Sequence, residues 1–325
     1  MVADVPVVEA MTSYVAPGDT VAIDRQRRIH LHCAGRGTPT VVLTAGLGSW
    51  SGTWARVQPL VAPVTRTCAW DRAGFGLSDP DAEVPQTVDR TTTDLERTLK
   101  AGGIPGPYIL VGHSAGVQEV LSFTDRRRGD VVGIVLVDPA RPHDLAREAA
   151  AGPKAAAADR AFFAAESRRL RDCAAGVAAG KITTGAPAEP CFRYYPEIPR
   201  RAIEVLARLD ADPARLRTQA SAYEEYEANG ERIAKADRIY GDLPLIVLSA
   251  ADPGLWAEEA KAEWPALIAD WADSHHALAA LSRRGERRVV ANARHLVQLD
   301  QPSAVADAIT DVVRMARDGR TRQSR

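Results

Sequence analysis

The pentapeptide Gly112-His113-Ser114-Ala115-Gly116 has residue types and a spacing that can present a serine as a nucleophile. It follows an apolar run at residues 108–111 and opens a stretch with helical spacing at residues 115–127. A serine between a strand and a helix lies on a tight turn that exposes its hydroxyl, and the flanking glycines let both elements approach. The positive end of the helix would stabilise negative charge that develops beside the serine. The pattern therefore predicts Ser114 as a nucleophile that attacks an ester-like bond.

A serine hydroxyl needs a general base within hydrogen-bond reach, and His295 is the best placed of the seven histidines. It follows the last predicted strand and precedes the final predicted helix. Because the residues after parallel strands converge on one sheet edge, we expect His295 to meet Ser114 there. We expect His30 and His32 to be structural or to face solvent, and the His113 side chain to point away from the Ser114 hydroxyl.

The base in turn needs a carboxylate that holds the imidazole in one tautomer and stabilises the imidazolium. Two aspartates are candidates, because Asp138 follows the sixth predicted strand and Asp252 follows the seventh. Either could reach His295 at the same sheet edge. Each could instead have a purely local role, as a cap or a turn residue.

Two backbone N–H groups should bind the developing oxyanion. One is the N–H of Ala115, the residue after the nucleophile. The other should come from the glycine-rich turn after the third strand, where we expect the N–H of Leu47. Nearby loops carry aromatic residues that are candidates to line an apolar pocket: Trp50, Trp54, Phe75, Tyr194 and Tyr195.

Apolar runs alternate with helical patterns along the chain, which indicates a mostly parallel, doubly wound α/β sheet. The first two runs read as an antiparallel hairpin, and the later ones are Val/Ile/Leu-rich, as parallel strands covered on both faces are. Helical patterns occupy residues 87–101, 115–127 and 302–317. The eight predicted strands are residues 20–24, 28–33, 40–44, 66–70, 108–111, 132–137, 243–249 and 287–291.

Residues 141–240 interrupt this alternation. The stretch is rich in Ala, Arg and Glu, lacks a strong strand pattern, and is too long for a loop. We expect a helical cap insertion over one end of the sheet, between core segments 1–140 and 241–325.

The bulk composition argues against several classes of partner. A net charge of −1 over 325 residues gives no reason to expect nucleic acid binding. No apolar run is long enough to span a membrane. The first residues lack the basic segment and apolar stretch of a secretory signal, so we expect a cytoplasmic protein. The sequence does not reveal the oligomeric state.

The four cysteines lack a CxxC spacing, so we expect no metal site. Cys33 and Cys68 lie in apolar strand-like runs and are expected to be unreactive core residues. Cys173 and Cys191 flank a loop rich in Gly and Pro; whether they form a disulfide is open.

Beyond the pentapeptide, two further segments resemble motifs of the α/β-hydrolase superfamily, in the branch of carboxylesterases and haloperoxidase-like esterases. The stretch from Asp71 to Ser78, DRAGFGLS, is similar to the D-x-x-G-x-G-x-S loop after the fourth strand. His295 with Gln301-Pro302 is similar to the H-x(5)-Q-P ending. The resemblance covers residues 21–314 and implies an eight-stranded, mostly parallel sheet with a helical cap.

This chain departs from the family pattern at two places. Ala45-Gly46 stands where members usually have His-Gly, so a side-chain contact of the oxyanion turn is lost while the backbone donor remains. Asp252 falls about one residue early for the usual acid after the seventh strand. A haloalkane dehalogenase-like subset takes its acid from the end of the sixth strand, so the resemblance favours Asp138.

The resemblance implies a serine esterase that acts on a small-molecule carboxylic ester, with a small or medium acyl or aryl group, without cofactor or metal. Dehalogenases and epoxide hydrolases of the family use an aspartate where this chain has Ser114, so those chemistries are disfavoured. The alternatives are an acyltransferase or lyase with the same triad, or a binding protein on a hydrolase scaffold without turnover.

Overall fold

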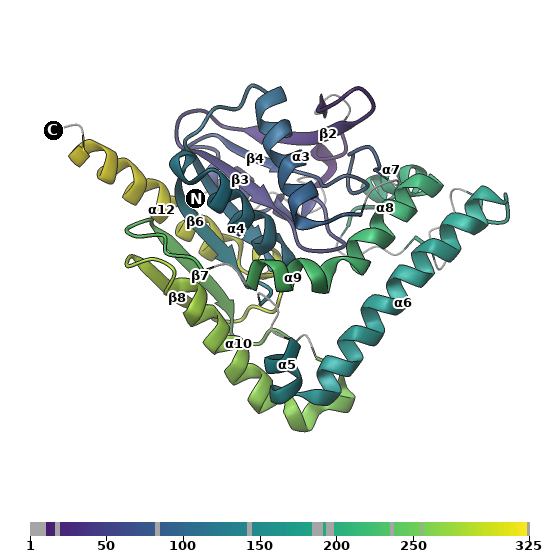
Figure 1. The fold of residues 1–325 in the computed structure, drawn as a ribbon. Helices are drawn as coiled ribbons and strands as arrows, with labels where there is room; N and C mark the ends of the chain where they lie inside the picture. The colour runs from purple at the N-terminus through teal and green to yellow at the C-terminus, as the bar shows by residue number, and fades with distance from the viewer. Residues whose placement is uncertain are drawn as a thin grey trace.

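A computed structural model of the protein shows an α/β sheet flanked by helices (Figure 1). The residues that it describes are 11–16, 20–81, 85–141, 145–183, 191–192, 198–234, 237–254 and 256–323.

Eight strands form one sheet in the order β1-β2-β4-β3-β5-β6-β7-β8. The contacts of β2 with β1 and with β4 are antiparallel, and all other neighbouring strands run parallel. The predicted fold class is confirmed, and each predicted strand is present within two residues at either end. The strands are β1 (Thr20–Ala22), β2 (Arg28–Ala34), β3 (Thr40–Thr44), β4 (Thr67–Trp70), β5 (Tyr108–His113), β6 (Val131–Val137), β7 (Leu245–Ala250) and β8 (Gly285–Val290).

Helices cover both faces of the sheet (Figure 1). Alternate residues of β3 belong to different cores, since Val41 and Leu43 pack on one face and Val42 on the other. This explains why the central strands are apolar at every position. The first face is covered by α2 (Gln58–Val61), α11 (Val297–Asp300) and α12 (Pro302–Gln323), and the second by α3 (Val88–Ala101), α4 (Val117–Arg126) and α10 (Trp264–Ala279).

Between β6 and β7 the described residues form five helices and no strand. The helices α6 and α8 pack against each other through a small core of their own that includes Leu170 and Leu216. In Figure 1, α6 lies apart from the sheet on the right-hand side. That residues 141–240 act as a cap stays a prediction. The helices are α5 (Leu145–Ala151), α6 (Pro153–Ala178), α7 (Arg200–Asp210), α8 (Pro213–Glu224) and α9 (Tyr226–Ala234).

All four cysteines are in disulfides. Cys33 and Cys68 were expected to be unreactive, and this is wrong: they face each other across β2 and β4 with Cα atoms 4.1 Å apart and are bonded. The pairing depends on the register of β2 against β4, which the sequence pattern does not reveal. Cys173 and Cys191, whose pairing the sequence leaves open, form the second disulfide. Disulfides are typical of oxidising compartments, so the cysteines give no support to a cytoplasmic location.

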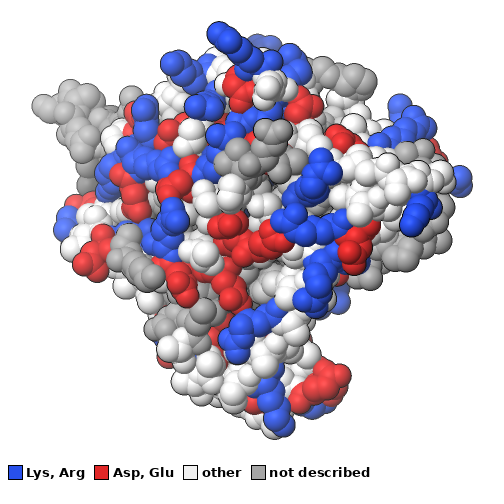
Figure 2. All heavy atoms as spheres, turned by 45° about the vertical axis from the view of Figure 1, so that its right-hand side comes forward, with Lys and Arg blue, Asp and Glu red and all other residues white. Residues whose placement is uncertain are grey.

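The molecular surface carries both signs of charge. On the face shown in Figure 2, Lys and Arg are interspersed with Asp and Glu. This mixture fits the net charge of −1. The absence of a nucleic acid partner stays a prediction. Among the described residues, no helix has the length and apolarity to cross a membrane.

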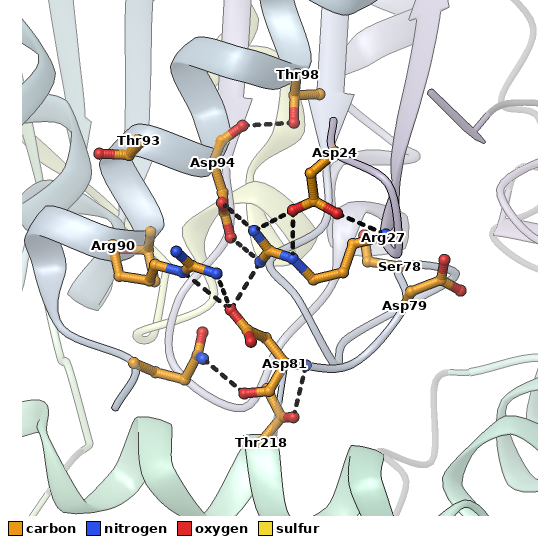
Figure 3. Close-up of polar contacts among 12 residues, drawn as sticks. Asp24, Arg27, Ser78, Asp79, Asp81, Arg90, Thr93, Asp94, Thr98 and Thr218 are labelled. Atoms are coloured by element: carbon orange, nitrogen blue, oxygen red, sulfur yellow. Dashed lines mark hydrogen bonds and ion pairs between the residues drawn. The ribbon is translucent and has the colours of Figure 1, made fainter. Parts of the chain in front are cut away.

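A buried ion network ties the edge of the sheet to α3 (Figure 3). The Arg27 guanidinium donates to both carboxylate oxygens of Asp94, at 2.6 and 3.0 Å, and to Asp81 at 2.8 Å. It also donates to Asp24 at 2.9 Å. The backbone N–H of Asp81 donates to the Thr218 hydroxyl of α8 at 2.9 Å. The network therefore joins the β1–β2 turn, the segment after β4, α3 and α8.

Removal of Arg27 should destabilise the protein strongly. The substitution Arg27→Met leaves Asp94, which is 1% exposed, without its cation, so we expect a loss of about 3–5 kcal/mol in the free energy of unfolding. Arg283→Met is the control, because Arg283 and Asp242 form an ion pair on the surface, where solvent screens the interaction and its effect on stability is small. Urea unfolding of both variants measures the difference. Equal effects of the two substitutions would contradict this role of Arg27.

Candidate functional site

Ser114 lies on the tight turn that its pentapeptide predicts. It follows β5 directly and has a φ of +50°, a left-handed conformation that is rare for a residue with a side chain. The flanking glycines are required by packing. A Cβ at Gly112 would lie 2.7 Å from the Gly116 carbonyl oxygen, and one at Gly116 would lie 2.7 Å from the Thr44 carbonyl oxygen. The turn leads through a short 3-10 segment (Ser114–Gly116) into α4, whose N-terminus lies beside Ser114.

The structure brings His295 and Asp138 together. Nδ1 of His295 lies 2.7 Å from Oδ2 of Asp138, across 157 residues of sequence. Because a carboxylate only accepts hydrogen bonds, Nδ1 carries the proton, and Nε2 of the neutral ring is left as the basic atom. Asp138 is fully buried and has a φ of +39° directly after β6.

Two further donors hold the Asp138 carboxylate. The Ala250 N–H at the end of β7 and the Trp271 indole N–H on α10 both donate to Oδ1, at 2.9 and 3.2 Å. Burial raises the pKa of Asp138, but the hydrogen bond and charge of His295 and the hydrogen bond from the Ala250 N–H together hold the pKa below its ordinary value. Asp138 is therefore an ionised, fixed partner of the imidazole.

Asp252, the other candidate acid, is exposed in the loop after β7. Its backbone N–H donates to the Ala293 carbonyl at 3.3 Å, which ties this loop to the segment before His295. The imidazole Nδ1 that an acid must hold is bonded to Asp138.

Two other histidines pack around this group and are neutral. Nε2 of His113 lies 2.9 Å from the His295 carbonyl oxygen, and burial together with the His295 charge lowers the pKa of His113 to about 3. His275 lies between the Ser249 hydroxyl at 2.7 Å and the Pro139 carbonyl at 3.0 Å. Burial lowers its pKa to about 4. Each ring thus donates to a backbone carbonyl beside the site, a role that a histidine's sequence position does not reveal.

An ion pair orients the turn that carries Leu47. Arg72 donates to both oxygens of Glu119 on α4, at 2.6 and 2.7 Å, and to the Gly46 carbonyl at 3.1 Å. In a planar trans peptide the C=O and the following N–H point in opposite directions. By holding the Gly46 carbonyl, Arg72 therefore sets the direction of the Leu47 N–H. It also provides a side-chain contact to a turn that lacks the usual histidine.

The buried Asp71 carboxylate accepts several hydrogen bonds near the loop after β3. It accepts from the His30 ring at 2.7 Å, the Ser51 N–H at 2.5 Å and the Leu77 N–H at 3.1 Å. Burial raises the pKa of Asp71, but the charge and hydrogen bond of His30 and the two N–H donors hold it below its ordinary value. The DRAGFGLS motif thus stabilises the loop after β3, and His30 is structural, as expected.

Ser114 and His295 line one cavity of about 520 Å³. Leu47 also lines it, while Ala115 is buried directly after Ser114 at the start of the helical turn. Six aromatic and three charged residues line much of the remaining wall: Arg141, Glu148, Asp159, Phe162, Phe163, Tyr223, Tyr226, Trp256 and Trp271. Cavities of this size hold small organic molecules.

Of the five predicted pocket aromatics, the three that the structure describes do not line this cavity. Trp54 is fully buried in the core, and Trp50 and Phe75 line a neighbouring cavity. Tyr194 and Tyr195 lie outside the described residues. No group of acidic, histidine or cysteine side chains among the described residues could hold a metal ion.

Known proteins resemble this chain over most of its length. The uncharacterized protein YqjL of Bacillus subtilis is 25% identical over 284 residues, which is 86% of each chain. Among solved structures, a thermophilic esterase of Thermogutta terrifontis has a TM-score of 0.57 at 20% identity and covers 92% of this chain and 97% of its own. A loop variant of the haloalkane dehalogenase DbeA from Bradyrhizobium elkanii has a TM-score of 0.60 at 18% identity, with 94% and 98% covered.

At these identities the structural neighbours show the fold alone, and their differing activities do not decide the chemistry. The family described as the alpha/beta hydrolase family matches residues 41–308. This match spans the elbow, both candidate acids, His295 and the helices between β6 and β7. The resemblance seen in the sequence motifs is confirmed, and the chain belongs to the alpha/beta hydrolase family.

Proposed function

We propose that this protein is a serine hydrolase that cleaves carboxylic esters through an acyl-enzyme, with Ser114, His295 and Asp138 as its triad. The observation that carries the proposal is the 2.7 Å hydrogen bond from His295 to a buried Asp138, with Ser114 facing the same cavity. Among the family chemistries, a serine at the elbow supports attack on an acyl carbon.

In the proposed reaction, Ser114 Oγ attacks the ester carbonyl while His295 Nε2 takes its proton. The N–H groups of Leu47 and Ala115 bind the oxyanion. His295 then protonates the departing alcohol, which leaves an acyl group on Ser114. A water molecule, deprotonated by His295, attacks this acyl-enzyme and releases the acid. Asp138 stays ionised and stabilises the imidazolium in both steps.

The helices α5 to α9 act in this proposal as a cap. Four aromatic residues that line the cavity with Ser114 come from α6 and the α8–α9 region: Phe162, Phe163, Tyr223 and Tyr226. These side chains would exclude water and select the substrate.

Replacement of the nucleophile should abolish turnover. We expect Ser114→Ala to lower kcat for p-nitrophenyl acetate by at least about 10³-fold, because the acyl-enzyme cannot form. Ser122→Ala on α4 is the control, since Ser122 does not line the cavity. A fluorophosphonate probe should label the wild type and not the Ser114 variant. Undiminished hydrolysis by Ser114→Ala would rule the proposal out.

The choice of acid is tested with two amides. We expect Asp138→Asn to lower kcat by about 10³- to 10⁴-fold, because an amide no longer holds the productive tautomer of His295. Asp252→Asn should stay within a few-fold of wild type, since Asp252 is exposed. Steady-state kinetics on one aryl ester measures both. Collapse of the Asp252 variant alone would reverse the assignment.

Trp271 should position the acid. Trp271→Phe removes the indole N–H that donates to Asp138, together with part of the ring, and keeps an aromatic side chain at this position. A hydrogen bond to a charged group is worth about 1.5–3 kcal/mol, so we expect kcat to fall by about 10- to 100-fold. Trp264→Phe on the same helix is the matched control, because its N–H bonds to the Ala257 carbonyl instead. A wild-type kcat in the Trp271 variant would show that this bond is dispensable.

A further inference from the structure

A second cavity of about 340 Å³ adjoins the one that holds Ser114. Phe162 of α6 and Tyr223 of α8 line both cavities, so these two side chains form the wall between them. Phe162 is 54% exposed, which leaves its ring free of the tight packing that would fix it. The wall is thus made of side chains and can open by rotation of a ring.

The oxyanion turn runs from one cavity into the other. Leu47 lines the cavity of Ser114, and the next three residues, Gly48 to Trp50, line the second. The Tyr223 hydroxyl lies against this turn, since a Cβ added at Gly48 would be 2.3 Å from its oxygen. A group bound at the oxyanion hole therefore lies next to the entrance of the second cavity.

The second cavity suits an apolar group. Its charged residues are paired with each other, Arg169 with Glu166 at 2.7 Å and Arg215 with Asp210 at 2.8 Å. Arg215 also donates to the Ser78 carbonyl at 2.7 Å. Because these charges are compensated within the protein, they do not require a charged ligand. The remaining wall is mostly apolar and includes Trp50, Phe75, Leu170, Ile198 and Leu206.

The reaction mechanism indicates whether the acyl or the alcohol part of an ester faces the second cavity. His295 must protonate the departing alcohol, so the alcohol lies on its side of the scissile bond. His295 contacts Trp271, with ring centroids 6.2 Å apart, and Arg141 lies over the same indole at 5.9 Å. The alcohol therefore faces the Trp271 and Arg141 end of the first cavity. The acyl group extends the other way, past the oxyanion turn.

Resting on the proposed ester hydrolysis, we infer that the second cavity is the acyl subsite, so the substrates are esters with an extended apolar acyl chain. Phe162 and Tyr223 separate the two ends of the substrate. The site would then select on acyl length much more strongly than on alcohol length.

Filling the second cavity tests this inference. Leu206→Trp places a larger side chain where Leu206 lines only that cavity. We expect kcat/KM for p-nitrophenyl decanoate to fall by at least about 10-fold, while p-nitrophenyl acetate and decyl acetate change by less than about 2-fold. Leu209→Trp is the matched control on the same helix, because Leu209 is 36% exposed and lines neither cavity.

Leu206→Ala is a second variant that tests the inference even if Leu206→Trp does not fold. It should favour long acyl chains over acetyl relative to wild type, because it enlarges the subsite. Equal changes for acetate and decanoate in both variants, or a selective loss of decyl acetate, would overturn the acyl assignment. In either case, hydrolysis that still depends on Ser114 would leave the proposed function standing. Hydrolysis that does not depend on Ser114 would remove both.

Discussion

The hydrogen bond between His295 and Asp138 is the interaction on which the arrangement of the site depends. It joins the loop after β8 to the end of β6, and Ser114 follows β5, the neighbour of β6. Parallel strands direct all three ends to the same sheet edge. Asp138 has an unusual backbone conformation, with a φ of +39°. The Ala250 N–H and the Trp271 indole N–H, from two other elements, hold its carboxylate and so stabilise this strained conformation.

The loop after β3 is supported by buried charges instead of by regular structure. Asp71 collects donors from β2, from the segment after Ser49 and from its own motif. Arg72, the next residue, turns the Gly46 peptide so that the Leu47 N–H points away from the guanidinium. The family motif DRAGFGLS is therefore a structural device for the proposed oxyanion turn, and a buried charge such as Asp71 is stable there only because every donor is in place.

What the sequence predicts well is local. The strands, the elbow around Ser114 and the helix-rich segment 141–240 each follow from residue patterns within about ten positions. The contacts that it misses depend on register and packing: the Cys33–Cys68 disulfide, the Arg72–Glu119 pair and the Trp271 donor all join distant segments. Asp138 and Asp252 both follow strands, and only the family resemblance favours Asp138 in the sequence. The backbone path is what makes Asp138 a buried acid and Asp252 an exposed one.

Among the described residues, three histidines lie in contact at this site, and their surroundings give them different chemical roles. His113 and His275 are buried, and their pKa values of about 3 and about 4 leave both rings neutral at neutral pH. A neutral ring carries one N–H, which each of them donates to a fixed carbonyl. His295 instead reaches the cavity and has an ionised carboxylate behind it. Burial thus keeps His113 and His275 neutral, as hydrogen-bond donors to the backbone. Of the three rings, only that of His295 both lines the cavity and has a carboxylate, Asp138, that stabilises its protonated form.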